Sequence, residues 1–294
     1  METRSKPQRR PEWLRVPHRE GPEYRWLKRL MRSKKLHTVC EEANCPNLGE
    51  CWQRRTATFM ILGDICTRAC RFCNVQSGRP APPDPGEAQR VAEAARAMEL
   101  RHSVVTSVTR DDLPDGGASA FAEVTRLIRE QVPDCTVEVL IPDFQGQIEP
   151  LATVLASQPD VLNHNLETVS RLFRRVQPRN RYEWSLAILE HAGKISPQTP
   201  TKSGLMVGLG ETAAEVLETM QELRQVGVSI LTIGQYLQPS RKHLPIERYY
   251  TPEEFETFRQ RGLDMGFQWV ESAPLVRSSY RAAGQFQGPK PRQS

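Results

Sequence analysis

The sequence lacks long apolar runs and has little histidine. No run of about 18 apolar residues occurs among its 294 residues, so it predicts no membrane span. Residues 1–20 are basic and lack the apolar core of a secretory signal, so we expect a cytoplasmic protein in a reducing compartment. Its seven cysteines are then not expected to form a disulfide framework. Neither cysteine cluster has a histidine at zinc-finger spacing, although Cys70 and Cys73 form a C-x2-C pair, which keeps zinc as an alternative.

Six of the seven cysteines form two triplets, and neither triplet has a fourth cysteine. The upstream triplet is Cys40, Cys45 and Cys51, and the downstream triplet is Cys66, Cys70 and Cys73. Iron–sulfur clusters that only carry electrons usually have four cysteine ligands, and structural zinc is closed by four ligands as well. Three thiolates at C-x3-C-x2-C spacing leave one iron of a four-iron cluster open, which indicates a place for a substrate or cofactor. The seventh cysteine, Cys135, is expected to pack as a small apolar residue.

The positive charge is concentrated at the start of the chain. Residues 1–39 hold 12 Lys and Arg against 4 Glu, a net +8, which leaves −3 for residues 40–294. A basic arm of this kind suggests nucleic acid first and an acidic protein second. A zinc-stabilised nucleic-acid-binding protein is therefore one alternative, and a two-cluster electron carrier is another. Trp13, Tyr24 and Trp26 predict that part of the arm packs against the body.

Downstream of the cysteines, predicted strands and helices alternate. The expected strands are residues 56–62, 103–108, 136–141, 161–165, 202–208, 230–236 and 267–272. Apolar residues at helical spacing lie between them, with helices expected near 91–98, 121–128, 146–157, 168–175, 183–194, 216–223 and 252–265. Repeated βα units predict a parallel sheet. Six such units and a final strand are fewer than the eight of a closed barrel, so a partial barrel and a doubly wound sheet both fit.

Polar residues collect where the predicted strands end. In both architectures the active site lies at the carboxyl ends of the strands. Segments 107–117, 141–146, 163–168, 208–212 and 234–245 each follow a strand, as the downstream triplet does. Any one of them could be structural, because Asp111 could cap a helix and Gly116 could serve a turn. Their common position favours one shared site.

Several motifs carry a family resemblance. The downstream triplet, with Phe72 before its last cysteine and at the end of the first strand, resembles the radical S-adenosylmethionine (SAM) superfamily. The upstream triplet and segments 110–118, 163–168 and 277–282 resemble the lipoyl synthase family from about residue 30 to 283. The resemblance implies an α/β fold, a partial (β/α)6 TIM-like barrel with extensions at both ends. The expected division is 1–55 for the arm and auxiliary-cluster segment, 56–250 for the barrel, and 251–294 for the C-terminal helix, strand and RSSY tail.

The resemblance implies a sulfurtransferase with two 4Fe-4S clusters and SAM as cofactors. A radical derived from SAM would take hydrogen from a protein-bound octanoyl-lysine, and the auxiliary cluster would donate sulfur at C6 and C8. Implied partners are octanoylated lipoyl carrier domains, from a 2-oxoacid dehydrogenase E2 or the glycine cleavage H protein. An electron donor such as ferredoxin or flavodoxin and an iron–sulfur carrier are also implied, with no nucleic acid and no membrane. The runner-up within the superfamily is a biotin synthase-like enzyme, a family that lacks the upstream triplet.

The same resemblance assigns roles to residues. The downstream triplet would hold the SAM cluster, and the upstream triplet the auxiliary cluster. SAM contacts are expected from Thr106, Ser107, Asp111, Gly116, Gly117, Asn163, Asn165, Glu167 and Lys202. The fourth ligand of the auxiliary cluster is expected to be Ser279 rather than Ser278, because three cysteines leave one iron without a ligand. The last strand can return the RSSY segment to the barrel.

Overall fold

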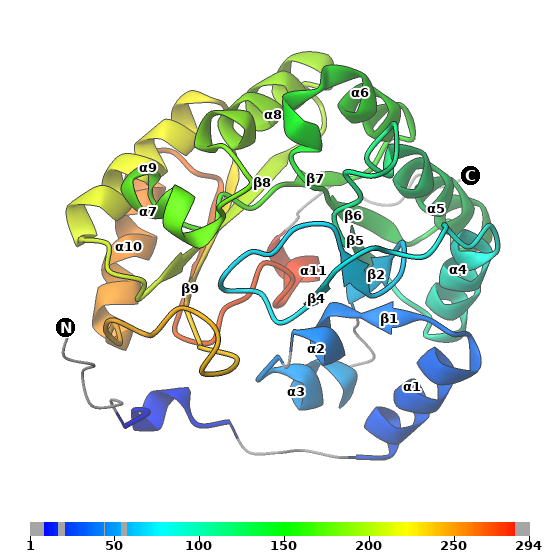
Figure 1. The fold of residues 1–294 in the computed structure, drawn as a ribbon, viewed down its shortest axis with the longest axis horizontal. Helices are drawn as coiled ribbons and strands as arrows, with labels where there is room; N and C mark the ends of the chain where they lie inside the picture. Colours follow the sequence, from blue (N-terminus) through cyan, green and yellow to red (C-terminus); the bar gives the residue numbers. More distant parts are fainter. Residues whose placement is uncertain (1–8, 17–20, 44, 54–57, 286–294) are drawn as a thin grey trace.

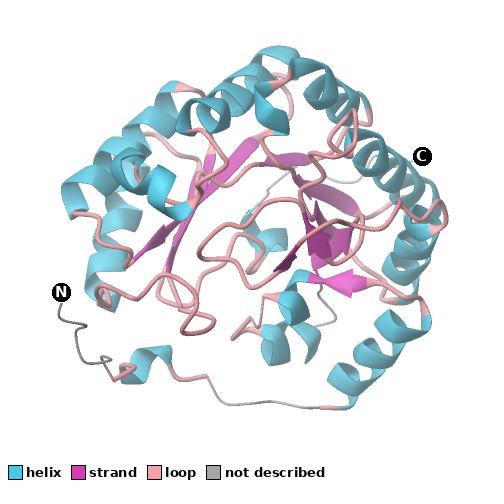
Figure 2. Cartoon of the chain, viewed as in Figure 1, coloured by secondary structure: helices cyan, strands magenta, loops and turns pink. Residues whose placement is uncertain are grey.

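An eight-stranded sheet curves around the middle of the molecule, and helices cover its outer face (Figures 1 and 2). The computed structural model describes residues 9–16, 21–43, 45–53 and 58–285. Seven parallel strands follow in chain order: β2 (Thr58–Ile61), β5 (His102–Ser107), β6 (Thr136–Leu140), β7 (Val161–Asn163), β8 (Thr201–Val207), β9 (Ile230–Gln235) and β10 (Trp269–Ser272). A short strand, β1 (His37–Thr38), pairs antiparallel with β2 at one edge. Among the described residues β1 and β10 do not pair, so the barrel is open.

The sheet and its helices share two apolar cores. Every residue of β2 and β9 is buried, as expected for parallel strands covered on both faces. The outer layer consists of α4 (Glu87–Ala97), α5 (Ala118–Gln131), α6 (Ile148–Ala156), α7 (Ser170–Val176), α8 (Tyr182–Ile195), α9 (Ala213–Gln225) and α10 (Pro252–Asp264). Both α9 and α10 begin with a capping box, formed by Thr212 with Glu215 and by Thr251 with Glu254. The caps satisfy backbone N–H groups at the helix starts and so fix where each strand-to-helix loop ends.

The predicted strands and helices are confirmed to within a few residues, and the partial barrel is confirmed over the doubly wound sheet. Five described elements at the start of the chain were not predicted: the 3-10 helix η1 (Glu12–Leu14), α1 (Pro22–Ser33), β1, α2 (Val39–Glu42) and α3 (Leu48–Gln53). The prediction that the arm packs is confirmed at Tyr24, whose ring lies 5.0 Å from that of Trp52, whereas Trp13 is 43% exposed. The division into three segments stays a prediction, and β10 adds a strand from the third segment to the sheet.

Segments from both ends of the chain meet at the barrel. The helix α11 (Ala282–Gln285) lies inside the ring of helices, and α2 and α3 stand at its open side (Figure 1). Asn47 Nδ2 donates to the carbonyl of Leu275 at 2.7 Å, which ties the two ends together. Among the residues that the structure describes, no helix has the length and apolar character needed to cross a membrane.

Candidate active site

The downstream triplet lies on a loop that is held from three sides. Short strands β3 (Ile65–Cys66) and β4 (Gln76–Ser77) close its base. The backbone N–H of Arg71 donates to Val176 at the end of α7, and its carbonyl accepts from the N–H of Leu244. His243 Nε2 lies 2.9 Å from the carbonyl oxygen of Cys73. These contacts place the loop over the inside of the barrel, next to the segments that follow β7 and β9.

The thiols of the downstream triplet influence one another. Burial raises the pKa of Cys70, and the neighbouring thiols of Cys73 and Cys66 raise it further. Burial also raises the pKa of Cys73 to about 11. Without iron Cys70 and Cys73 are protonated thiols, so metal binding must release their protons. Three partly exposed soft donors in one loop fit an iron–sulfur cluster.

Four buried polar atoms at or just after the ends of β5 and β7 have no hydrogen-bond partner among the described residues. They are Ser107 Oγ, Asn163 Oδ1, His164 Nε2 and Asn165 Oδ1. Ser107 ends β5 and the other three residues end or follow β7, so all lie at the carboxyl side of the sheet. Buried polar atoms are normally paired, so this group fits a polar ligand such as SAM. Three of the four belong to the residues predicted to contact SAM.

Glu167 is close to the same loop. Burial raises the pKa of Glu167 to about 7, against the effects of Asn165 and Arg277. Its charge in turn raises the pKa of both Cys70 and Cys73. Glu167 also has a positive φ of 72°, which is rare outside glycine. The structure therefore brings Asn165 and Glu167 together with the downstream triplet.

Four other predicted SAM contacts already have protein neighbours. Thr106 Oγ1 donates to the carbonyl of Leu140 at 2.8 Å. Both carboxylate oxygens of Asp111 accept from Arg68, at 2.7 and 2.8 Å. A Cβ on Gly116 would lie 2.9 Å from the ring of Phe144, and one on Gly117 would lie 2.3 Å from Leu62. Side-chain packing thus explains both glycines, and the roles of all four residues in SAM binding stay predictions.

Lys202 takes part in a buried ion pair. Its Nζ donates to Oε1 and Oε2 of Glu138 at 2.9 and 3.1 Å, and both side chains are almost fully buried. Asn163 Nδ2 donates to the same carboxylate at 2.9 Å, and His102 Nε2 lies 3.5 Å from it. Lys202 is near the amino end of β8, whereas the downstream triplet follows the carboxyl end of β2. Its contact with SAM stays a prediction, because its ammonium group already has a carboxylate partner.

We expect Lys202→Met to destabilise the protein by about 3–5 kcal/mol, because it leaves the Glu138 carboxylate in the interior without its main countercharge. The double variant Lys202→Met/Glu138→Gln should lose less, since no charge is stranded. Urea unfolding followed by circular dichroism measures both. An equal loss in the two variants would show that the charge is not the cause.

The same carboxylate makes stability depend on pH. Burial alone would raise the pKa of Glu138, but Lys202 and His102 lower it to about 2. A carboxyl with a depressed folded-state pKa stabilises the fold above its unfolded value of about 4.3 and loses this contribution as pH falls towards the folded value. Wild-type stability should therefore drop between about pH 4.3 and 2 by more than that of the double variant.

The upstream triplet lines a cavity of about 320 Å³ at the other end of the strands. The lining includes Cys40, Cys45, Cys51, His102, Arg277 and Ser279. Thr58 and His102, the first residues of β2 and β5, also line it, so this cavity lies at the amino ends of these strands. The shared site was expected at the carboxyl ends of the strands, and the downstream triplet lies there, whereas the upstream triplet lies at the amino ends of β2 and β5. Ser278 is absent from the described lining.

The cavity combines three thiols with charged side chains of both signs, Arg277 and Glu50 among them. Burial raises the pKa of Cys40 to about 12, and the thiols of Cys45 and Cys51 contribute to the rise. Burial lowers the pKa of Arg277, while Cys45 and Glu167 act in the opposite direction, so Arg277 is close to both cysteine sites. Among the described residues, no three Cys, His, Asp or Glu side chains are close enough to hold one metal ion. The three thiols instead line a cavity, and with a cationic side chain they fit a four-iron cluster, which carries net negative charge with thiolate ligands.

Two residues of the upstream segment hold the C-terminal tail at the cavity. Tyr280 Oη lies 3.4 Å from both carboxylate oxygens of Glu50, and Arg281 pairs with Glu50 at 3.7 Å. Together with the bond from Asn47 to Leu275, these contacts bring the RSSY segment to the upstream triplet. The structure thus joins two motifs that are more than 200 residues apart in the sequence.

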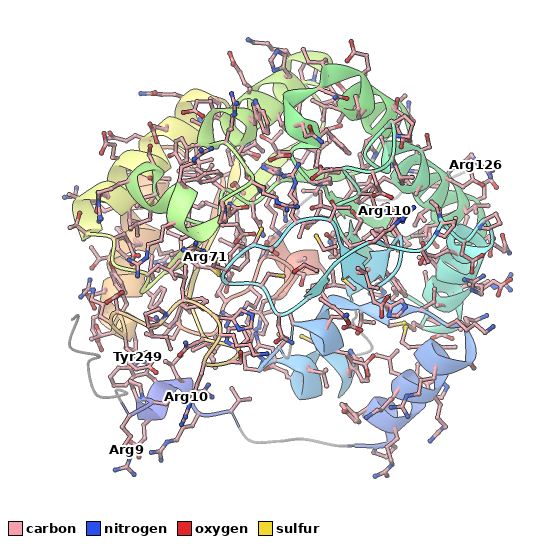
Figure 3. All side chains as sticks on the ribbon, viewed as in Figure 1. Arg9, Arg10, Arg71, Arg110, Arg126 and Tyr249 are labelled. Carbon is pink, nitrogen blue, oxygen red and sulfur yellow. The ribbon has the colours of Figure 1, made fainter. Side chains whose placement is uncertain are left out.

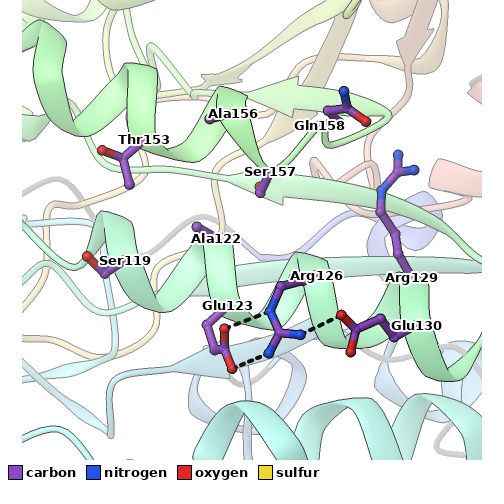
Figure 4. Close-up of a pocket in the computed structure, with 10 residues that line it drawn as sticks. All are labelled: Ser119, Ala122, Glu123, Arg126, Arg129, Glu130, Thr153, Ala156, Ser157 and Gln158. Carbon is purple, nitrogen blue, oxygen red and sulfur yellow. Dashed lines mark hydrogen bonds and ion pairs between the residues drawn. The ribbon is translucent and has the colours of Figure 1, made fainter.

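A larger groove of about 680 Å³ lies on the outer surface between α5 and α6 (Figure 4). Its arginines are occupied by acidic neighbours: Arg126 pairs with Glu123 and Glu130, and Arg129 with Asp160. No cysteine and no predicted site residue lines this groove. It is therefore separate from the chemistry of the two triplets.

Several residues that support the sites were not predicted from the sequence. Arg68 lies within the C-x3-C motif and bonds Asp111, Asp143 and Asn180. Glu138 is a charged residue inside an otherwise apolar strand, which is a pattern that could have indicated a buried partner. Gln177 also contacts this site, and its sequence position gave no sign of this, because Cys70 is 107 residues away in sequence.

Comparisons with known proteins agree with this geometry. The model of the radical SAM superfamily matches residues 60–223, and that of the N-terminal domain of lipoyl synthase matches residues 1–45. A lipoyl synthase of Rubrobacter xylanophilus is 57% identical over 93% of this chain and 85% of its own length. A lipoyl synthase of Chloroflexus aurantiacus is 58% identical over 93% of this chain and 90% of its own length.

Solved structures share the fold at low identity. The hydrogenase maturase HydG from Carboxydothermus hydrogenoformans superposes with a TM-score of 0.57 at 14% identity, covering 88% of this chain and 76% of its own. Methylornithine synthase superposes with a TM-score of 0.53 at 11% identity, covering 89% and 81%. By its sequence matches and its fold, the chain belongs to the lipoyl synthase family of radical SAM enzymes.

Proposed function

We propose that the two cysteine triplets divide the work of sulfur insertion between them. Members of the family are radical SAM enzymes that use SAM and 4Fe-4S clusters and act on an octanoylated lipoyl domain. The proposal for this chain is that the downstream triplet holds the cluster that binds SAM, and that the upstream triplet with Ser279 holds the cluster that supplies sulfur. The observation that carries it is the cavity that contains all three upstream cysteines and Ser279.

With its cluster bound, the SAM site supplies a carbon-centred radical, which can take hydrogen from the unactivated C6 and C8 positions of the octanoyl chain. The protein binds, orients and excludes water. Ser107, Asn163 and Asn165 offer unpaired polar atoms to SAM, and Glu167 offers a carboxyl group next to the triplet. Arg277, which lines the upstream cavity, interacts electrostatically with both Cys45 and Glu167.

The direct test is anaerobic reconstitution of the full chain with iron, sulfide and SAM, followed by mass spectrometry of an octanoyl-lysine peptide. We expect addition of two sulfur atoms per peptide and formation of 5′-deoxyadenosine. Formation of 5′-deoxyadenosine without added sulfur would contradict the role of the upstream triplet. Family membership decides against the zinc and biotin synthase-like alternatives.

Basic side chains surround the downstream triplet. Exposed Arg and Lys side chains occur on the cysteine loop, on α7 and on the segment that follows β9. Backbone hydrogen bonds of Arg71 to Val176 and Leu244 join these three segments. They include Arg71, Arg79, Arg174, Arg241 and Lys242, and none of these has an ion pair among the described residues. Figure 3 shows Arg71 inside the ring of helices, and Arg9 and Arg10 on the basic arm outside it. This distribution supports docking of an acidic carrier domain, such as that of an E2 or H protein, over the triplet.

Deleting residues 1–20 should raise the KM for an intact octanoylated carrier domain several-fold, because charge on the arm speeds encounter with an acidic partner. The KM for a short octanoyl peptide should change little, and the effect on the carrier should shrink at high salt. Steady-state assays with both substrates measure this. Equal changes for carrier and peptide would contradict the docking role. Residues 1–8 and 17–20 lie outside the described residues.

The remaining partners follow from what the reaction consumes. Each SAM cleavage needs one electron, so a low-potential donor such as ferredoxin or flavodoxin is proposed. Each turnover consumes sulfide from the auxiliary cluster, so an iron–sulfur carrier is proposed to rebuild it. These components work together in the cytoplasm in the proposed scheme.

A further inference from the structure

Arg68 is buried in the middle of the downstream triplet. Its side chain is 3% exposed, and its backbone N–H lies 3.4 Å from Cys66 Sγ. The guanidinium bonds both carboxylate oxygens of Asp111 and both of Asp143, at 2.7 to 2.8 Å. Its Nη1 also donates to Asn180 Oδ1 at 2.8 Å. One cation therefore faces two carboxylates, of which that of Asp143 is fully buried and that of Asp111 is 28% exposed.

The bond from Arg68 fixes the orientation of two side-chain amides. A guanidinium can only donate, so the atom of Asn180 that faces it must be the carbonyl oxygen. Asn180 Nδ2 then points to Gln177 and donates to its Oε1 at 2.6 Å. Gln177 Nε2 faces the carbonyl of Leu166 at 3.4 Å, which agrees with this orientation. The hydrogen-bond network, rather than the shape of the amide, assigns the oxygen of Gln177.

The oxygen of Gln177 faces a predicted cluster ligand. Oε1 lies 3.9 Å from Cys70 Sγ, and Gln177 is 5% exposed. With Cys70 as a thiol, its S–H donates to this oxygen. With Cys70 as a thiolate on iron, the oxygen presents the negative end of a fixed dipole to the cluster. An amide N–H donor at this place would stabilise added negative charge, whereas the oxygen destabilises it. Hydrogen bonds and charges around the ligands set the potential of an iron–sulfur cluster.

We propose that Gln177, oriented by Arg68 and Asn180, lowers the reduction potential of the cluster on the downstream triplet. Reduction adds one negative charge to the cluster, and the oxygen of Gln177 opposes that charge. Cleavage of SAM needs a strongly reducing cluster, so the arrangement serves the reaction. Gln177 is a positioning residue here, since it acts through Cys70. The inference rests on the proposed role of the downstream triplet.

The test uses the full chain with the upstream triplet replaced by alanine, so that only one cluster is titrated. In this background Gln177→Leu removes the oxygen at similar side-chain size. We expect the reduced-to-oxidised ratio at a fixed potential to rise about tenfold, which is a shift of about 59 mV to more positive potential for a one-electron couple. A redox titration followed by electron paramagnetic resonance measures the shift. The matched control is Gln89→Leu, an exposed glutamine on α4, which should leave the potential unchanged.

Two further variants keep the test decisive. Asn180→Leu removes the group that orients Gln177, so it should shift the potential in the same direction, and the double variant should shift it no further than Gln177→Leu. If Gln177→Leu fails to assemble a cluster, Gln177→Glu keeps the shape and adds negative charge, so it should shift the potential to more negative values. An unchanged potential in Gln177→Leu, or in Gln177→Glu where that variant replaces it, overturns the inference. Failure of the unmodified background to bind any cluster overturns the proposed function instead.

Discussion

Alanine at all three cysteines of the downstream triplet is expected to abolish SAM cleavage, whereas alanine at all three of the upstream triplet should stop sulfur insertion and leave SAM cleavage intact. The reason is spatial. The downstream thiols lie on the loop that follows β2, at the side of the sheet where β5 and β7 end with their unpaired polar atoms. The upstream thiols line a separate cavity at the amino ends of β2 and β5. The cysteines of one triplet can therefore be replaced without removing a ligand from the cluster proposed for the other triplet.

Two products separate these outcomes. 5′-Deoxyadenosine, measured by liquid chromatography, reports SAM cleavage, and the mass of an octanoyl-lysine peptide reports added sulfur. Cys135→Ala is the matched control, because Cys135 is buried near the start of β6 and belongs to neither triplet. It should retain both products. Lipoyl product from the upstream triple variant would show that its sulfur comes from another source.

Ser279→Ala should reduce complete lipoyl formation by at least tenfold while the SAM cluster stays intact. Ser279 lines the cavity with the upstream triplet, and its oxygen is the donor proposed to complete the cluster. A serine oxygen is a hard ligand where iron–sulfur sites usually have soft thiolates, so this bond should be the weakest of the four. A weak bond suits a cluster that must give up sulfide.

Ser278 provides the matched control for this prediction, since it is next in sequence but outside the described cavity lining. Ser278→Ala should keep most of the activity. Ser279→Cys should bind the cluster more firmly and stall turnover, with iron content at or above that of the wild type. Full product from both Ser279→Ala and Ser278→Ala would mean that neither oxygen is a needed ligand.

The barrel could be predicted because its strands and helices depend on local pattern. Apolar β-branched runs and helical spacing recur from residue 56 onward, and each run is a strand or helix of the structure. The start of the chain was harder, because α2 and α3 have four and six residues and are held by tertiary contacts. Short helices have little stability of their own, so their sequences carry weak patterns.

The site was only partly predictable for a similar reason. The spacing of the cysteines indicates their role as ligands. The ion-pair partners of Asp111 and Lys202, in contrast, are charged residues that are distant in sequence. Arg68 binds the Asp111 carboxylate, which is 43 residues away in sequence, and Glu138 binds Lys202, which is 64 residues away. Charge alone could not reveal these pairs. A lysine at a strand start has the same pattern whether it binds a ligand or a buried glutamate.

The cavity of the upstream triplet is lined by segments from near both ends of the chain. This arrangement determines which parts of the cavity exist first during synthesis. The downstream triplet spans only residues 66–73, whereas the upstream cavity needs residues 275–284 to close it. During synthesis the N-terminal part of a chain emerges and folds first. A ribosome-bound chain can therefore present all three upstream thiols while the wall that carries Ser279 does not yet exist. If the upstream triplet and Ser279 hold the proposed sulfur-donating cluster, we expect its delivery to follow translation, and a chain truncated before residue 275 should lack a complete site for it.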